Sequence, residues 1–563
     1  MLDSIQLSLL MGPVNPVPVP RMVLDSLASV EVTVKDMETT GFQLIFSIDK
    51  NSPLQLLFLI TGGTPLLFMR VVLVTTVNGI ANVLIDGVIT KNDIAPGDKG
   101  SNSTLTLTGE DLTALMNQSD LSGFPFPACT AEMRVAQLLS KYAVFGVVPL
   151  VIPSVMSYEP LPTSQTPSQK GTDLAYIRAL AKQAGFVFYL DPGPVPGMTR
   201  AYWGPQVKVG LVQPPLSADM DAYTNVESLT FAFNQQQNRK PTVYSFSDQS
   251  GSSGSIPIPG IGILNPPLGA IAPLPTNIMG DLRPPWDDAA KKPVPEVIMQ
   301  GLASAAQFAE AITGQGTLDV TRYGGVLQAR QLVGVRGAGF AFDGLYYVKS
   351  VTHHIIARRV QTRFQPEPRW IGIHGAQPAL IMSFPDQSNG GNPQRYYGKY
   401  RGTVVANNDP QQTGRVLVTV ADVLGMTSSS WATPCMAGAG AQAGCFIVPP
   451  LGSQVWVEFE QGDPDYPILA GSFWGATGDV PTCANTPAAP PPGQNIVLQT
   501  TGGNMVLLSD APATPTTGGI VIKSGSAMIV VNSTGIYIDN GNGAVITLLG
   551  SSVDINSGGL TIT

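Results

Sequence analysis

The fold is decided by residues 519–562, which read GIVIKSGSAMIVVNSTGIYIDNGNGAVITLLGSSVDINSGGLTI. Apolar pairs recur there about every eight residues, each flanked by Gly, Ser, Thr or Asn. The pairs are Ile520/Ile522, Met528/Val530, Ile536/Ile538, Ile546/Leu548, Val553/Ile555 and Leu560/Ile562. A period of this length holds one short strand and one turn. Such a unit is too small to close a core of its own, so the repeats must stack and also bury their inner face on something else.

Two further copies of the same chain are expected to cover that face. One turn of a single-chain β-solenoid takes about three strands and roughly twenty residues, far more than this period offers. The missing strands are therefore expected from other chains, and threefold symmetry supplies them while removing free sheet edges. A single-chain solenoid or an ordinary series of sandwich strands is the alternative. The residues expected in the trimer core are Ile520, Ile522, Ile536, Ile538, Ile546, Leu548, Val553 and Ile555.

The composition of the whole chain favours a mainly β architecture with a few helices. At 563 residues the chain is too long for one compact core. Only 12% of its residues are charged, about half the usual share near 25%. It contains 60 Gly and 49 Pro, while hydrophobic residues make up 44%. This combination is typical of many short strands joined by tight turns rather than of disorder.

Charge and cysteine content exclude several classes of protein. A net charge of -8 argues against binding nucleic acid or anionic lipid through basic residues. The first twenty residues carry Asp3 instead of a basic region, and Pro13 and Pro16 interrupt their apolar run, so no signal peptide is predicted. Synthesis in the cytoplasm is expected. The four cysteines are expected to be idle thiols, with a Cys435–Cys445 bridge as the alternative.

Composition shifts divide the chain into five segments. Residues 1–375 are expected to form two barrel-like β units, with helical insertions at Thr130–Tyr142, Thr172–Gln183 and Glu296–Ile312 and a Pro/Gly-rich excursion at 250–285. A linker at 376–397 precedes a compact β module at 398–478. A Pro-rich linker at 479–494 then leads to the repeat at 495–563.

No catalytic, metal or cofactor site is predicted. His353 and His354 are adjacent, so on a strand they face opposite sides and cannot bind one metal together. Glu458 and Glu460 alternate along a predicted strand, and a glycosidase pair is the alternative to exposed acids. We expect exposed acids, because inward-facing Val455, Val457 and Phe459 explain the alternation. The glycine-rich run at 438–444 lacks phosphate-loop spacing and is expected to be a loop between strands.

The β module at 398–478 carries a specific set of residues. It contains GKYRGTVVANNDPQQTGRVLVTVADVLG followed by CFIVPPLGSQVWVEFEQGDPDYPILAGSFW, and it resembles the OB-fold domain of the VgrG-type spike proteins of contractile injection systems and contractile phage tails. Upstream runs such as DGVITKN and YGGVLQARQLVGVRGAG are similar to the tail hub of the same family. The OB-fold residues that carry the resemblance are Gly402, Asp409, Pro410, Gly414, Arg415, Gly452, Gly462, Asp463, Pro464 and Trp474.

This resemblance implies a structural protein rather than an enzyme. It implies a homotrimeric central spike, with a hub of two barrels per chain, an OB-fold and an intertwined β-helix or prism as the needle. The implied partners are a hexameric inner tube of Hcp-like proteins, baseplate proteins and the target membrane during injection, with no nucleic acid and no cofactor. The particle would carry the spike at the baseplate end of the tube, either released or docked to a membrane.

The last strand of the repeat carries no polar cap in this sequence. Uncapped solenoid ends expose apolar pairs and backbone groups, so a PAAR-like tip protein is expected to dock on Leu560, Thr561, Ile562 and Thr563. Two other functions are compatible with a β-helical repeat: a secreted enzyme acting on polysaccharide, and a trimeric fibre adhesin.

Overall fold

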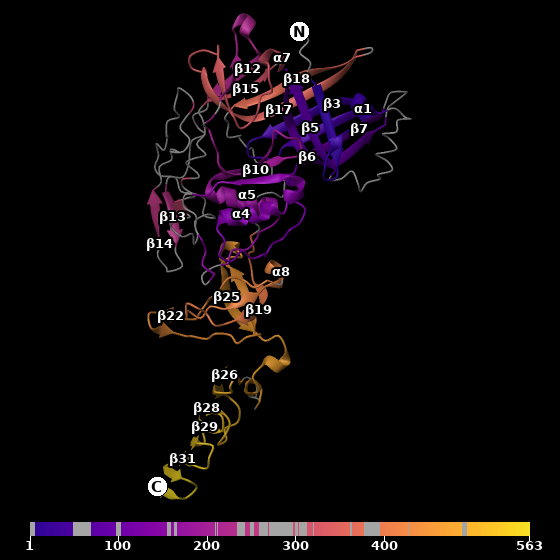
Figure 1. Cartoon of the computed structure of the whole chain (residues 1–563). Helices are drawn as coiled ribbons and strands as arrows, with labels where there is room; N and C mark the ends of the chain where they lie inside the picture. Colours follow the sequence, from indigo (N-terminus) through magenta and orange to yellow (C-terminus); the bar gives the residue numbers. More distant parts are fainter. Residues whose placement is uncertain are drawn as a thin grey trace. The chain divides into compact units, whose positions relative to one another are not determined.

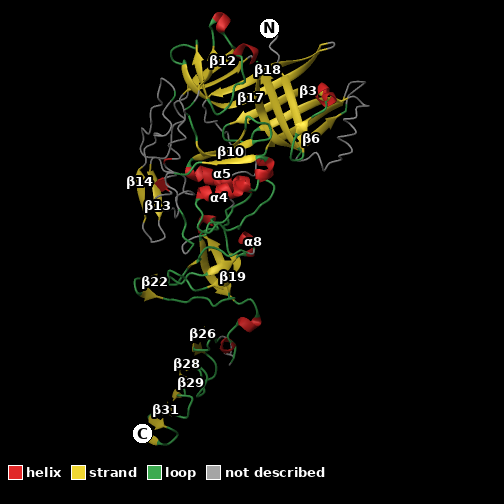
Figure 2. Ribbon diagram, viewed as in Figure 1, coloured by secondary structure: helices red, strands yellow, loops and turns green. Residues whose placement is uncertain are grey.

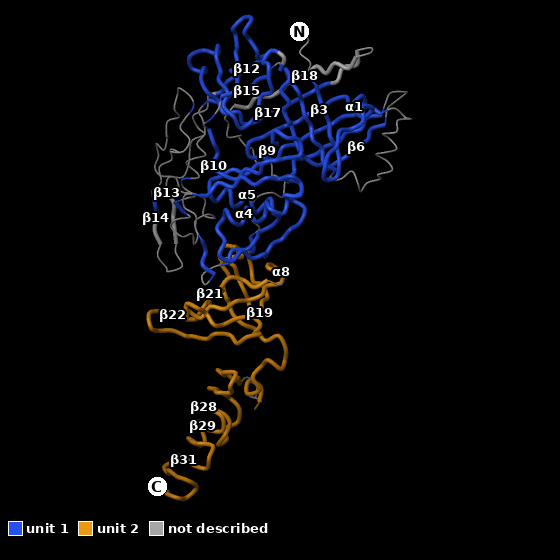
Figure 3. Tube along the Cα trace, viewed as in Figure 1, with its two compact units in different colours: residues 1–396 blue, residues 397–563 orange. Residues whose placement is uncertain are grey.

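The computed structural model describes residues 6–48, 69–96, 103–154, 159–162, 166–208, 210, 212–233, 243–247, 253–257, 268, 297–298, 302, 312–318, 320–360, 363–375, 395–425, 427–486 and 493–562. The chain divides into two compact units, residues 1–396 and residues 397–563 (Figure 3). Strands dominate both units (Figure 2). None of the described helices is long and apolar enough to cross a bilayer.

The first unit is built on one large sheet that joins both predicted β units. The strands of its main path lie in the order β12-β15-β18-β17-β3-β4-β7-β6-β5-β1-β2, and β16 and β11 branch from β17. Their bounds are β1 Gln6–Gly12, β2 Val17–Pro18, β3 Leu27–Lys35, β4 Gly41–Ile48, β5 Arg70–Val77, β6 Ile80–Ala95, β7 Ser103–Asp111, β11 Val212–Ser217, β12 Val226–Phe233, β15 Ile312–Leu318, β16 Leu332–Arg336, β17 Gly344–Val360 and β18 Arg363–Gly375. Because β3 pairs antiparallel with β17, the strands of the two β units are joined by hydrogen bonds.

The core of this unit is apolar and continuous across the β3–β17 pair. Val32, Phe46 and Val348 are fully buried members of it. His353 lies opposite Val32 and is also buried, and this desolvation lowers the pKa of its imidazole to about 3. His353 is therefore a neutral core residue at physiological pH. Among the described residues no His, Cys, Asp and Glu side chains gather into a metal-binding group.

Two helices cover a small sheet within the first unit (Figure 1). The sheet has the order β8-β10-β9, and α4 packs on β8 while α5 packs on β9. Thr130 and Thr172 cap these helices through their hydroxyls, and Gly185 ends α5 with φ 68°. Both predicted helices are thus confirmed. The bounds are β8 Val147–Val151, β9 Phe186–Pro192, β10 Thr199–Pro205, α4 Ala131–Ser140 and α5 Asp173–Ala184.

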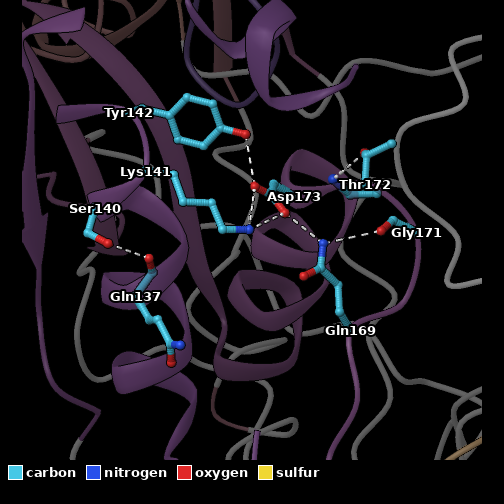
Figure 4. A network of polar contacts seen from close by, with 9 residues as sticks. Gln137, Ser140, Lys141, Tyr142, Gln169, Gly171, Thr172 and Asp173 are labelled. Carbon is cyan, nitrogen blue, oxygen red and sulfur yellow. Dashed lines mark hydrogen bonds and ion pairs between the residues drawn. The ribbon is translucent and has the colours of Figure 1, made fainter. Parts of the chain in front are cut away.

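A polar network fastens α4 to the start of α5 (Figure 4). Asp173 is buried at the first position of α5, where the helix dipole favours its charge. Its carboxylate accepts hydrogen bonds from Lys141 Nζ (3.1 Å), Tyr142 Oη (2.8 Å) and Gln169 Nε2 (2.7 Å). Burial, together with the bond to Asp173, raises the pKa of the Tyr142 phenol. The network therefore holds the ends of two helices and the loop before α5 in one arrangement.

A buried ion pair ties the large sheet to the segment that enters β10. Arg70 and Asp86 are 2% and 1% exposed, and Arg70 Nε and Nη2 each donate to Asp86 at 2.7 Å. Arg70 also donates to the carbonyls of Val14 and Gly197, and Thr199 Oγ1 donates to Asp86. Both charges are therefore paired and hydrogen-bonded, as burial requires.

Parts of two predicted segments lie outside the described residues. In the predicted helix 296–312 only residues 297–298, 302 and 312 are described, and Ile312 begins strand β15. In the excursion 250–285 the described residues include β14, Ser253–Pro257, which pairs with β13, Val243–Ser247. The remaining described α-helices are α1 Arg21–Ser26, α3 Thr113–Met116, α7 Val320–Tyr323 and α8 Ala421–Leu424, and the 3-10 segments are Ala143–Phe145, Asp221–Tyr223, Glu460–Gly462, Thr477–Asp479 and Thr482–Ala484.

The second unit contains a five-stranded sheet followed by an eight-stranded ladder. The five strands lie in the order β20-β19-β24-β25-β21 and enclose Val404, Val418 and Val455, which are 2% exposed or less. Their bounds are β19 Tyr400–Ala406, β20 Leu417–Thr419, β21 Thr433–Pro434, β24 Gln454–Phe459 and β25 Pro467–Phe473, and a hairpin of β22 Ala439–Gly440 and β23 Ala443–Gly444 lies between β21 and β24.

The ladder is an antiparallel meander in which each strand pairs with the next. Its strands are β26 Asn495–Gln499, β27 Met505–Ser509, β28 Gly519–Ser524, β29 Ala527–Asn532, β30 Gly535–Asp539, β31 Val545–Leu549, β32 Ser552–Ile555 and β33 Leu560–Ile562. Glycines with positive φ, such as Gly525 (59°) and Gly550 (55°), make its tight turns.

Candidate oligomerisation site

The ladder aligns apolar side chains in two columns along one face. Cross-strand partners continue from strand to strand: Leu508 lies opposite Ile520, and Ile520 lies opposite Val531. The first column is Ile496, Leu508, Ile520, Val531, Ile536, Leu548, Val553 and Ile562. The second is Leu498, Val506, Ile522, Ile529, Ile538, Ile546, Ile555 and Leu560. We call these sixteen residues the apolar ladder face.

The apolar ladder face is open to solvent in the single chain. Ile522 is 47% exposed, Leu498 62% and Ile562 56%. No charged side chain belongs to either column. A continuous apolar stripe is typical of an association surface, because leaving apolar side chains in water is unfavourable.

All eight residues predicted for the trimer core belong to the apolar ladder face. One pair singled out from the sequence does not: Met528 and Val530 point to the other face, and Ile529 and Val531 occupy the columns instead. The run Met528-Ile-Val-Val531 is apolar throughout, so a period of two fits it in either register. The four ladder residues on β26 and β27 were not singled out, although Ile496-Val-Leu498 and Val506-Leu-Leu508 carry the same apolar signal.

Strand pairing also differs from the expectation that other chains supply the missing strands. In the described part of the ladder every strand hydrogen-bonds to its neighbours in the same chain. What the single chain lacks is a cover for one face. In the described part of the chain the ladder hydrogen bonds are made between its own strands, while the apolar side chains of this face stay exposed.

The chain itself covers the opposite face of the ladder on strands β27, β28 and β29. Leu507, Val521 and Val530 are at most 3% exposed and pack with partly buried Met505 and Tyr537. The loop after β27 folds back here, because Asn532 Nδ2 donates to the carbonyls of three of its residues: Thr514 (2.6 Å), Thr517 (3.0 Å) and Gly518 (3.5 Å). On strands β27 to β29 the chain thus covers one face of the ladder, whereas the apolar ladder face stays exposed.

Three of the four residues predicted to bind a tip protein, Leu560, Thr561 and Ile562, belong to the last described strand. Leu560 and Ile562 are 53% and 56% exposed, and β33 pairs with β32 alone among the described strands. The side chain of Thr561 and the whole of Thr563 lie outside the described residues. β33 is therefore an edge strand, which is able to pair with another chain.

The OB-fold motif forms a rigid loop around one carboxylate. Asp409 Oδ1 accepts from Arg415 Nη2 (2.6 Å) and Nε (3.1 Å), and Asp409 also accepts from the amides of Gln411 and Thr413. Burial alone would raise the pKa of Asp409, but the bonds from Arg415 and these amides outweigh it and hold the pKa well below its usual range. The Arg415 guanidinium also lies 5.7 Å from the Trp431 ring. These contacts make the loop structural.

The other motif residues make turns or permit close packing. Gly414, Gly452 and Gly462 have φ near +80°, a region that favours glycine. A Cβ on Gly402 would lie 3.0 Å from a methyl group of Val457. Pro410 and Pro464 lie in the turns that Asp409 and Asp463 organise, and Trp474 is 64% exposed.

Neither the glycosidase pair of Glu458 and Glu460 nor the Cys435–Cys445 bridge, the two alternatives considered from the sequence, forms in the part of the chain that the structure describes. Glu458 pairs with Lys399 at 3.0 Å, whereas Glu460 lies beyond the strand in a 3-10 segment, so the two are not neighbours along one strand face. Val455, Val457 and Phe459 are buried, as predicted. Cys435 and Cys445 are exposed free thiols, so the described residues contain no bridge between them.

Two segments match known domain families. Residues 400–474 match the type VI secretion system/phage-baseplate injector OB domain, and residues 495–561 match the phage baseplate V C-terminal trimerisation domain. In these two segments the matches support the resemblance to VgrG-type spike proteins. Both matches fall inside the segments of the chain that the sequence set apart.

Comparison with whole proteins agrees with the VgrG-type fold. A chain of the lidless PdpA–VgrG complex superposes with a TM-score of 0.56 at 9% identity, covering 100% of this chain and 99% of that one. The lidded Francisella PdpA–VgrG complex gives 0.54 at 9% identity, covering 98% and 80%. The actin cross-linking toxin VgrG1 of Vibrio cholerae serotype O1 is 43% identical over 54 residues, 10% of this chain and 5% of that protein's length.

Proposed function

We propose that the chain is the structural central spike of a contractile, phage-tail-like injection machine and that it acts as a homotrimer. The observation that carries this proposal is the apolar ladder face, which is open in one chain and lies within the segment that matches a trimerisation domain. Three copies bury these columns against one another. The result is a narrow rod whose backbone hydrogen bonds are complete in each copy, and it resists bending because bending must break them.

The same proposal assigns a partner to each part of the chain. The first unit would face the inner tube, because two β units in each of three copies offer six similar surfaces to a hexameric ring of Hcp-like proteins. Baseplate proteins would surround this hub. The edge strand β33 would receive a PAAR-like tip protein, since its backbone groups and Leu560 and Ile562 are open. The target membrane is met only during injection, and the assembled particle, released or membrane-docked, is the proposed location.

The test is the solution mass of the full chain. Light scattering on the purified protein is expected to give three times the 59.2 kDa of one chain. Hydrogen exchange is expected to protect the strands from β26 to β33 in the same sample. A monomer with a protected ladder contradicts the proposal, because the apolar face would then be stable without a cover.

A further inference from the structure

The OB-fold module carries an exposed hairpin whose composition is unusual for a free loop. Residues 435–451 read CMAGAGAQAGCFIVPPL and contain no charged side chain. We call this segment the arm. Every residue from 437 to 447 is exposed, and Phe446, Ile447 and Leu451 are 70%, 57% and 63% exposed. In Figure 1 its tip, marked by β22, extends away from the sheet that contains β19 and β25.

The arm is built as a defined hairpin. Ala439 pairs with Gly444 and Gly440 pairs with Ala443, and the Cys445 amide donates to the Gly438 carbonyl at 2.9 Å. A Cβ on Gly444 would lie 2.4 Å from that carbonyl oxygen, so glycine is required there. At the base, the Cys435 amide donates to Leu469 O, and Asn407 Nδ2 donates to Pro449 O. The exposed apolar residues are thus held in place before any partner binds, which lowers the entropic cost of binding.

The same module presents an aromatic surface on the outer face of its sheet. The Arg401 guanidinium lies 5.6 Å from the ring centres of both Trp456 and Phe473, and these rings are 4.8 Å apart. Trp474 follows at the end of β25 and is 64% exposed. We call Arg401, Trp456, Phe473 and Trp474 the aromatic platform. The arm and Trp474 are both open in one chain, so the arm does not cover the platform of its own module.

We infer that the arm of one copy packs on the aromatic platform of the neighbouring copy's OB module. This inference rests on the trimer proposed above. The segment that matches a trimerisation domain starts at residue 495, about twenty residues after the OB module. Three modules tethered so closely meet at effective concentrations in the millimolar range. An arm without charge brings no ion of its own into such a contact, and the Arg401 guanidinium of the platform already lies over the Trp456 and Phe473 rings. Threefold repetition closes the set of contacts.

Cross-linking between two differently labelled chains tests this contact. In the first full-length chain, Cys445 is the sole cysteine, because the other three are replaced by serine: Cys129→Ser, Cys435→Ser and Cys483→Ser. The second carries all four Cys→Ser changes and Thr403→Cys, which places a thiol beside the platform, where Thr403 contacts Gln454. The two are co-expressed, treated with a short bismaleimide and separated on a denaturing gel. A covalent product of two chains is expected from the mixture and not from either chain alone.

Matched variants decide the result. Adding Phe446→Asp and Ile447→Asp to the first chain is expected to lower the product about tenfold, because anchoring aromatic and aliphatic contacts are lost. A second chain with Ile80→Cys in place of Thr403→Cys puts the thiol at a more exposed position, in the first unit, and is expected to give no product. Trimers by light scattering that yield no product, or equal yield with Ile80→Cys, overturn the arm contact and leave the proposed spike intact. A monomer by light scattering overturns both.

Discussion

Ile522 of β28 lies directly opposite Ile529 of β29, in the middle of the apolar ladder face. The two side chains are 47% and 38% exposed in one chain, although both are large and apolar. Their neighbours on the opposite face, Val521 and Val530, are buried by the chain itself. The contrast between the two faces of the same two strands is the reason that we propose the apolar ladder face as the surface at which copies meet.

A charge in this column is expected to dissociate the trimer. Ile522→Asp places a carboxylate where three copies bury apolar side chains, and an unpaired buried charge costs several kcal/mol in each copy. Light scattering should show the mass falling from that of a trimer toward that of a monomer. Ser533→Asp, in the exposed turn after β29, adds the same charge outside the column and should leave the mass unchanged.

The needle shows how far a periodic pattern predicts structure. Alternation identified the inner face wherever polar residues separate the apolar ones, as in Ile536-Tyr-Ile538. It failed at Met528-Ile-Val-Val531, where both faces of β29 are apolar because Val530 is buried on the covered side. The pattern also did not reveal that each strand pairs within its own chain, since pairing depends on turns and not on the period.

The pairing of distant strands in the first unit could not be predicted from the sequence, for a different reason. Val32 and His353 lie opposite each other on paired strands, although more than three hundred residues separate them in the chain. Nothing in the sequence of either strand indicates which other strand it pairs with. The sequence predicted two β units, but it did not indicate that their strands join in one sheet. Local signals succeeded: Thr172 and Gly185 marked the ends of α5 because capping depends on adjacent residues alone. The OB module was identified by its resemblance to a known family, which several Gly, Pro and Asp residues carry.

Removing the Asp409 carboxylate is expected to loosen the OB-fold loop. Asp409→Asn loses the ion pair with buried Arg415, at a cost on the order of 3 kcal/mol. Hydrogen exchange at the amides of Thr413 and Arg415, which donate to this carboxylate, should accelerate in the variant. Unchanged exchange at these two amides contradicts a structural role for the pair.

The same carboxylate predicts an acid dependence. Its pKa is lower in the folded chain than the value near 3.9 of an unfolded one, so its stabilising effect is complete above that value. The effect is lost as the pH falls below about 4 toward the folded pKa. The difference in exchange rate between the native chain and Asp409→Asn should therefore shrink with acidification below pH about 4. A difference that stays constant there would exclude this linkage.

The buried pair of Arg70 and Asp86 predicts a strong coupling. Arg70→Met leaves the Asp86 charge buried and without its cation, which should lower the free energy of unfolding of the first unit by about 3–5 kcal/mol. Replacing both partners, with Arg70→Met and Asp86→Leu, should recover much of this loss because no ion remains buried. Urea denaturation of Arg70→Met, of Asp86→Leu and of the double variant, each compared with the native chain, measures the coupling. Additive losses would show that the two residues act independently.

The last strand of the ladder is expected to be dispensable for the trimer and necessary for tip binding. Deleting residues 560–563 removes β33, one of eight ladder strands, so light scattering should still give a trimer. Capture of the cognate PAAR-like protein on affinity resin should be abolished, because the edge strand and the exposed Leu560 and Ile562 are gone. The double change Leu560→Asp and Ile562→Asp should act in the same way.

The control is the double change Ile496→Asp and Leu498→Asp, which alters similarly exposed residues on β26, at the other end of the ladder. It should leave capture unaffected in any trimer that forms. Capture by the truncated trimer would place the tip protein elsewhere on the chain.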